Sequence, residues 1–304
     1  AEFFKASGID PHLFYNGKRT YTRLLMKAGL IEEREESLEE KVLMRAYPTL
    51  LSLDSPHWIS YLKENLKAPQ RPTTILDREY AAMLYHTLLS KDLEALGIIS
   101  PEALILSLSH WHPFIKELEA FLTMQENALS FLPQSPGVLY PCALEVYCHY
   151  TRNQIFAALG YDHPSSIREG VKFMTPEKSF AVTHPTDVFL VTLNKSDRDF
   201  SETTRYEDYS IDRMTFHWQS QSTTTPHSKT GQRYERLCRE KEKAGYILLF
   251  VRENKKDTYG GTQSYTFLGR VSIERLQGSQ PCPAPICRPP HGNRRKRRPV
   301  KSCK

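Results

Sequence analysis

Long apolar runs are scarce in this chain of 304 residues. The longest, such as Tyr246–Val251, has the length of a strand, so the sequence predicts neither a membrane-spanning helix nor an N-terminal signal peptide. Cysteine is also scarce: three of the six cysteines lie in residues 281–304, and Cys142, Cys148 and Cys238 have no paired spacing. The composition therefore predicts no disulfide framework and a reducing, cytoplasmic setting.

Complete nucleotide, nuclease and metal motifs are missing as well. Gly17–Arg19 lacks the preceding glycine and following hydroxyl of a phosphate-binding loop. His227–Lys229 begins a phospholipase-D-type nuclease pattern, but Tyr234 stands where that pattern needs an aspartate. The cysteines and histidine of the last 24 residues lack zinc-site spacing. We therefore expect no cofactor and no metal.

Positive charge is concentrated at one end. The formal net charge is +6, yet residues 281–304 hold eight Lys and Arg and no Asp or Glu, so residues 1–280 are slightly acidic. A DNA-binding face on the folded part would need a local arrangement of Lys195, Arg198, Arg205, Lys229 and Arg233. We expect residues 281–304 to form a disordered basic tail, because a Pro- and Arg-rich segment buries little apolar surface. The chain opens without an initiator methionine, and we expect it to be a fragment of a longer protein.

Apolar periodicity divides the chain into a helical and a strand-rich part. Residues 1–135 are predicted to form a helical domain that ends at the Pro- and Gly-rich segment 133–137. Its helices are expected at Leu38–Tyr47, His57–Leu66, Leu76–Leu96 and Pro101–Met124. Residues 171–280 are predicted to form a β-barrel crossed by a helix near Gly231–Lys243, with strands at Phe180–Thr183, Val188–Leu193, Thr215–Ser220, Tyr246–Arg252, Tyr265–Leu268 and Val271–Arg275. The fold class is therefore α+β.

Residues 136–170 are predicted to be a helical hairpin that links the two parts. Tyr150–Gly160 repeats the pattern of Tyr21–Leu30, in which Thr151 or Thr22 is expected to cap a short helix that stops at glycine. With a helix over residues 144–149, this pattern allows a helix-turn-helix. A packed hairpin is favoured because no strongly basic recognition face follows.

The candidate site lies where residues 188–193 and 215–220 meet a polar, aromatic loop. Alternation puts His217, Gln219 and Gln221 on one face of the second strand, and the loop adds Arg205, Tyr206, Asp208 and Tyr209. Aromatic rings stack on a flat heterocycle and amides pair with its edge, so this set suits a nucleobase. The predicted base-binding residues are Tyr206, Asp208, Tyr209, Trp218, Gln219 and Gln221, and the predicted DNA-backbone contacts are Asn194, Lys195, Arg205, Gln232 and Arg233.

Three other interpretations stay open. Residues 239–243 could supply Glu240 and a lysine to a metal-dependent nuclease centre together with Asp187 or Asp208, although such a charge run is usually a solvated helix face. Trp218 could equally be a core residue, and the whole chain could be a coupling or protein-interaction module of a helicase with no DNA site.

Eight stretches resemble a bacterial family, the domain of unknown function 3427, which forms the C-terminal region of SauUSI-type restriction proteins with a helicase and a phospholipase-D-type nuclease. They are 141–146, 150–155, 193–196, 203–209, 216–221, 231–234, 249–253 and 265–269. The resemblance implies a helical coupling domain followed by a barrel similar to the PUA and SRA-like domains. It also implies that the chain is a target-recognition module that reads 5-methyl- or 5-hydroxymethylcytosine in double-stranded DNA. By this resemblance the chain is no enzyme alone, and its partners are modified DNA and the helicase and nuclease domains of the same or a neighbouring polypeptide.

Overall fold

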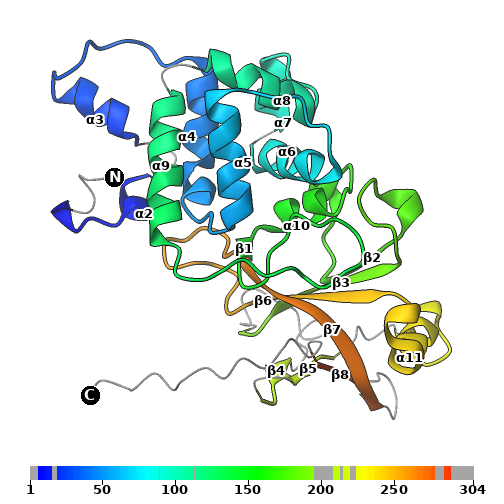
Figure 1. The fold of residues 1–304 in the computed structure, drawn as a ribbon. Helices are drawn as coiled ribbons and strands as arrows, with labels where there is room; N and C mark the ends of the chain where they lie inside the picture. The colour runs from blue at the N-terminus through cyan, green and yellow to red at the C-terminus, as the bar shows by residue number, and fades with distance from the viewer. Residues whose placement is uncertain are drawn as a thin grey trace, which may run out of the picture.

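The computed structural model describes residues 6–15, 19–88, 90–111, 114–194, 208–212, 215–219, 224–277 and 284–288. Helices gather at one end and a curled, mixed sheet at the other (Figure 1). The α+β class predicted from the sequence is confirmed. In the described part of the chain, no helix is long and apolar enough to cross a membrane.

Eight α-helices with assigned bounds lie in the described residues of the first part of the chain, and two of the longest start at a capping box. Ser37 and Glu40 form a capping box on α4, and Thr74 and Asp77 form one on α6, so orphan amides of the first turn are satisfied by neighbouring side chains. The helices are α2 (Pro11–Phe14), α3 (Tyr21–Lys27), α4 (Leu38–Leu50), α5 (Pro56–Lys67), α6 (Ile75–Thr87), α7 (Ser90–Ala95), α8 (Pro101–Ser107) and α9 (Phe114–Ala128).

Two predicted helices are each divided in the structure. The stretch predicted as one helix at residues 76–96 is interrupted at Leu88, which is extended and buried, before α7 begins. The stretch predicted at residues 101–124 is interrupted after η1 (Leu108–His110) at Trp111, which is also buried. In both places burial of a large apolar side chain outweighs helix continuation, so the chain can turn and bring α6, α8 and α9 around one core.

The predicted helical hairpin at residues 136–170 is wrong. Residues 144–149 form no helix: Tyr147 has a φ of 73°, and its amide donates to Phe267 O at 2.7 Å. His149–Tyr150 instead forms strand β1, which pairs with Tyr265 and Thr266. The predicted capping box of Thr151 and Gln154 is confirmed at the start of α10 (Arg152–Ala158), whereas α3 is capped by Thr20 and not by Thr22.

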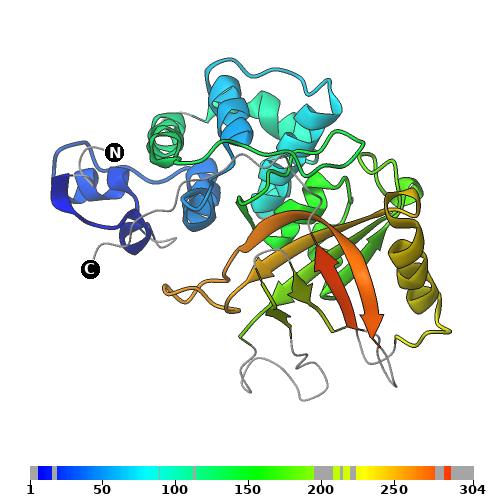
Figure 2. The ribbon, with the colours of Figure 1, turned by 60° about the horizontal axis from the view of Figure 1, so that its bottom comes forward.

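In the described residues the sheet has eight strands, in the order β2-β3-β6-β7-β8-β5-β4 with β1 paired to β7. Neighbouring strands are antiparallel except β3 and β6, which are parallel. The segment of chain that connects β3 to β6 includes α11 (Lys229–Glu240). Within the described residues the end strands β2 and β4 do not pair, so the sheet is curled and open where a closed barrel was predicted (Figure 2). The strands are β2 (Val171–Met174), β3 (Thr186–Thr192), β4 (Tyr209–Ser210), β5 (Phe216–His217), β6 (Tyr246–Arg252), β7 (Tyr265–Gln277) and β8 (Ala284–Arg288).

Strand β7 produces much of the curl because its first half pairs with β6 and its second half with β8. A bulge opposite Leu249 and Phe250 bends it at Gly269, whose φ of 90° suits glycine. A Cβ at Gly269 would also lie 3.1 Å from a Val146 methyl group. The two strands predicted at residues 265–268 and 271–275 are therefore one bent strand.

Two further strand predictions are corrected. Residues 180–183 form no strand. Residues 284–288, predicted to belong to a disordered tail, form β8, and their backbone pairs with β7 on one side and β5 on the other. Backbone pairing on both edges satisfies the backbone polar groups of this segment. Its residues Ala284, Ile286 and Cys287 are also less polar than the predicted tail taken as a whole. The rest of the predicted tail lies outside the described residues.

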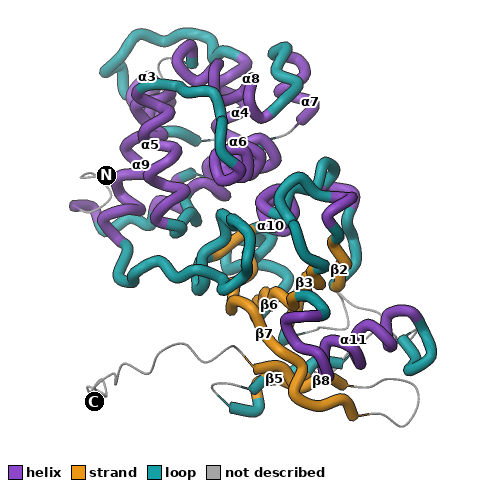
Figure 3. The backbone as a smooth tube through the Cα atoms, turned by 45° about the vertical axis from the view of Figure 1, so that its right-hand side comes forward, coloured by secondary structure: helices purple, strands orange, loops and turns teal. Residues whose placement is uncertain are grey.

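The central strands β3 and β6 are buried on both faces, as expected for parallel neighbours. Val188 and Leu248 face a core that continues through α10 into the helices, while Phe189 and Leu249 face a second core under α11. The backbone tube shows α10 between the helices and the strands, and α11 beside the curled sheet (Figure 3). The predicted domain boundary between residues 135 and 136 therefore lies within one continuous apolar core that both parts share.

Candidate nucleobase-binding site

The short hairpin of β4 and β5 presents an aromatic surface at the edge of the sheet. Tyr209 lies directly opposite His217 in the antiparallel register. Their rings stack with centroids 4.7 Å apart and an interplanar angle of 14°. Tyr209 remains 50% exposed, so the stacked pair offers an accessible flat surface. His217 was placed on the site face by alternation, but only the cross-strand register shows that it supports Tyr209.

A carboxylate lies beside this pair and is held by the backbone just after β5. Asp208 precedes β4, is half-buried, and its Oδ1 accepts a hydrogen bond from the backbone N–H of Gln219 at 2.9 Å. This bond joins the two strand ends and fixes the carboxylate next to Tyr209. The structure therefore brings together three of the predicted base-binding residues: Asp208, Tyr209 and Gln219.

Trp218, predicted to stack on the base, is a core residue instead. It is only 5% exposed and stacks on Phe189 with centroids 4.1 Å apart. Tyr234 of α11 contacts it edge-on, with centroids at 5.8 Å. Because both neighbours belong to the core beneath α11, the indole supports the hairpin from below and presents no surface to a ligand. This corrects the prediction.

Arg233 is likewise corrected from a DNA-backbone contact to an internal ion-pair partner. Its Nε and Nη2 donate to the two carboxylate oxygens of Asp187 at 2.9 and 2.7 Å. The guanidinium also lies 4.0 Å from the centroid of the Phe173 ring. Burial raises the pKa of Asp187, and the paired guanidinium opposes that rise. A bidentate pair in this position anchors α11 to β3.

Two other predicted DNA-backbone residues are exposed. Asn194 follows β3 and its Nδ2 donates to Asn254 Oδ1 at 3.2 Å, while Gln232 lies on α11 with its Nε2 3.4 Å from His227 O. Asn254 was not predicted as a site residue, because its contact with Asn194 arises only where the paired strands β3 and β6 end side by side. The remaining predicted residues lie outside the described residues: Lys195, Arg205, Tyr206 and Gln221.

The carboxylates considered for a nuclease centre have separate partners. Glu240 accepts from Arg236 at 2.8 Å and from Arg239 at 3.2 Å on the solvent side of α11. Asp187 is held by Arg233, and Asp208 by the Gln219 amide. Among the residues that the structure describes, no group of three His, Cys, Asp or Glu side chains is placed to hold a metal ion.

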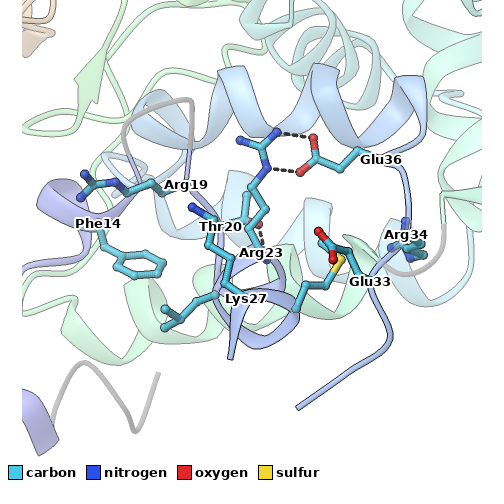
Figure 4. A pocket seen from close by; sticks show the side chains of 10 residues that line it. Phe14, Arg19, Thr20, Arg23, Lys27, Glu33, Arg34 and Glu36 are labelled. Carbon is cyan, nitrogen blue, oxygen red and sulfur yellow. Dashed lines mark hydrogen bonds and ion pairs between the residues drawn. The ribbon is translucent and has the colours of Figure 1, made fainter. Parts of the chain in front are cut away.

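A separate cavity of about 610 Å³ lies around α3 (Figure 4). Four cationic side chains line it, but Arg23 is paired with Glu36, and Arg34 donates to the buried Glu40 at 2.5 and 2.7 Å. Phe14, Leu24 and Met26 supply apolar lining. These ion pairs neutralise two of the four cationic side chains that line the cavity.

Comparison with known proteins supports a family for part of the chain. Residues 144–281 match the family model described as "Domain of unknown function (DUF3427)", which confirms the resemblance for that segment. No curated protein sequence matches. Among solved structures the chain is similar to one titled "crystal structure of KRYPTONITE in complex with mCHG DNA and SAH", with 14% identity and a TM-score of 0.36. The alignment covers 80% of this chain and 45% of that chain, so this chain spans less than half of its length.

Proposed function

We propose that this chain is a DNA target-recognition module that reads modified cytosine for a type IV restriction helicase-nuclease acting in the cytoplasm. In this role it cuts no DNA itself, and the motor and nuclease belong to the same or a neighbouring polypeptide. The observation that carries the proposal is the exposed Tyr209–His217 stack with Asp208 and Gln219 at its side. The match of residues 144–281 to the family model supports it.

The chemistry of this group suits a cytosine turned out of the duplex. The pairing edge of cytosine has one amino donor and two acceptors, which the Asp208 carboxylate and the Gln219 side-chain amide can complement. The aromatic pair can stack on the ring, and such stacking is worth about 1–3 kcal/mol per base. The C5 position needs only space and apolar contact, so a methyl or hydroxymethyl group there can be accepted.

Backbone contacts are proposed for four polar residues outside the hairpin. Asn194 and Gln232 are exposed at the end of β3 and on α11, and Lys195 and Arg205 lie outside the described residues. Contacts of this kind bind every sequence alike and weaken steeply with salt, because counterions are released when phosphates are neutralised. Selectivity for the modified base should therefore reside in the hairpin and affinity in its surroundings.

Fluorescence titrations of two duplexes, identical except for one 5-methylcytosine, test the proposal. The parent chain should bind the methylated duplex more tightly, and Tyr209→Ala or Asp208→Ala should remove the difference. Tyr21→Ala, a partly exposed tyrosine on α3, is the matched control and should retain it. Circular dichroism of each variant shows whether the fold is intact.

Two results would count against the proposal in different ways. Equal affinity of the parent chain for both duplexes rejects recognition of modified cytosine. Selectivity that survives both hairpin substitutions rejects the assigned residues. Magnesium-dependent cutting by the isolated chain that is lost in Asp208→Ala would support the nuclease interpretation instead.

A further inference from the structure

Three side chains far from the hairpin form a hydrogen-bonded series of the kind that activates a serine. His12 Nδ1 lies 3.2 Å from Asp10 Oδ1, and His12 Nε2 lies 3.2 Å from Ser52 Oγ. The two ring nitrogens thus contact a carboxylate on one side and a hydroxyl on the other. An imidazole oriented in this way can take the hydroxyl proton while the carboxylate stabilises the resulting imidazolium.

Packing from three distant segments holds this series in place. Asp10 caps α2 by accepting the His12 amide at 2.9 Å, and the Tyr259 hydroxyl donates to its other oxygen. The Tyr259 ring stacks on His12 with centroids 5.4 Å apart and an interplanar angle of 6°. Ser52 lies in the turn that follows α4, where its hydroxyl can also donate to Pro48 O at 3.3 Å. The imidazole of His12, on α2, therefore lies between the turn after α4 and the loop that connects β6 to β7.

The series opens into a cavity of about 320 Å³. His12 and Ser52 line it together with His149, Tyr259 and Gln263. The hydrogen bond to Asp54 raises the pKa of His149. The protonated form of this second imidazole, on the wall of the same cavity, is suited to stabilise negative charge that develops on a substrate oxygen.

We propose that Ser52 is a nucleophile for small carboxylic esters, with His12 as its general base and Asp10 as the positioning carboxylate. Ser52 Oγ forms a bond to the acyl carbon while its proton passes to His12 Nε2. The ester bond then breaks, and the alcohol leaves with that proton. A water molecule attacks the acyl-serine with His12 again as base, which releases the carboxylic acid and restores the hydroxyl. A cavity of this size takes a short acyl group. This activity is independent of DNA recognition at the β4–β5 hairpin.

Labelling of the full chain with a fluorophosphonate probe tests the proposal, with peptide mass spectrometry to locate the adduct. We expect the adduct on Ser52 and its loss in Ser52→Ala. Ser60→Ala, an exposed serine on α5 whose hydroxyl contacts Glu64, is the matched control and should be labelled like the parent. His12→Gln should slow labelling by about 100-fold, as expected for loss of a general base.

Hydrolysis of p-nitrophenyl acetate gives an independent reading of the same site. Ser52→Ala and His12→Gln should reduce the rate to that of the buffer, while Ser60→Ala should leave it unchanged. An adduct found equally in the parent and in Ser52→Ala overturns the assignment. So does a labelling rate in His12→Gln equal to that of the parent, because the hydroxyl would then react without its base.

Discussion

His149 Nδ1 lies 2.6 Å from Asp54 Oδ2, and the His149 amide donates to Asp54 Oδ1 at 2.8 Å. In a second pair the histidine and the carboxylate exchange sides: His57 of the helical part has its Nδ1 2.6 Å from Glu145 Oε1. Asp54 and His57 flank the start of α5, and Glu145 and His149 flank the turn before α10. The two histidine–carboxylate pairs therefore join the helical part to the segment that enters the sheet.

The first prediction is a pH dependence of this junction. The hydrogen bond to Asp54 raises the pKa of His149 from 6.5, so its stabilisation is fully present below pH 6.5 and is lost as the pH rises through the folded-state pKa. The His149 side chain is 48% exposed, and the contribution should stay below about 1 kcal/mol. Urea unfolding of the parent and of Asp54→Asn should give free energies that differ most near pH 6 and converge at alkaline pH. His110→Gln, an exposed histidine, serves as control. A difference that does not change with pH contradicts the assignment.

The second prediction concerns Glu79, which is fully buried in α6. Its Oε2 accepts the Ala143 amide at 2.6 Å, and its Oε1 has no hydrogen-bond partner among the described residues. Burial raises the pKa of Glu79 from 4.5 to about 9. A raised folded-state pKa means that stability declines as the pH rises from 4.5 through 9.

Glu79→Gln keeps an acceptor for Ala143 and removes the titrating group. We expect little change in the unfolding free energy at pH 4.5 and a gain above about 1 kcal/mol near pH 9. Denaturant unfolding at these two pH values measures it. A variant that shows no gain in stability near pH 9 contradicts the raised pKa of Glu79.

The third prediction follows from the Asp187–Arg233 pair. Arg233→Met should lower the unfolding free energy by about 3–5 kcal/mol, because it leaves the buried Asp187 carboxylate unpaired. Asp187→Asn combined with Arg233→Met should recover part of this loss by removing the buried charge. Arg236→Met on the exposed side of α11 is the control and should change stability little. A negligible effect of Arg233→Met would place the arginine in a role other than anchoring α11.

The fourth prediction compares two truncations at the C-terminal side. Ending the chain after Gln280 removes β8, whereas ending it after Pro290 retains β8. The shorter chain should melt several degrees lower, because β5 and the second half of β7 lose their shared neighbour. It should also lose selectivity for the methylated duplex, since β5 carries His217. Equal melting temperatures for the two truncations would show that β8 does not stabilise the sheet.

Local pattern in the sequence was sufficient for several elements. The run Tyr246–Arg252 was predicted as a strand with the bounds that β6 has in the structure. The capping box of Thr151 and Gln154, the helix predicted near Gly231–Lys243 and the α+β class also follow from neighbouring residues alone. These features depend on interactions within a few residues of chain, which periodicity and capping preferences report directly.

Only the tertiary structure decided the features that depend on distant partners. Trp218 is buried because β5 places it against Phe189, and Arg233 is occupied because α11 lies over Asp187. Residues 144–149 are not helical because β7 takes their backbone hydrogen bonds. Residue type alone predicted Asp208, Tyr209 and Gln219 as base-binding residues, but it is the β4–β5 register that makes them neighbours. Ser52, His12 and Tyr259 meet only through packing of three remote segments, and no local pattern records a contact of that separation.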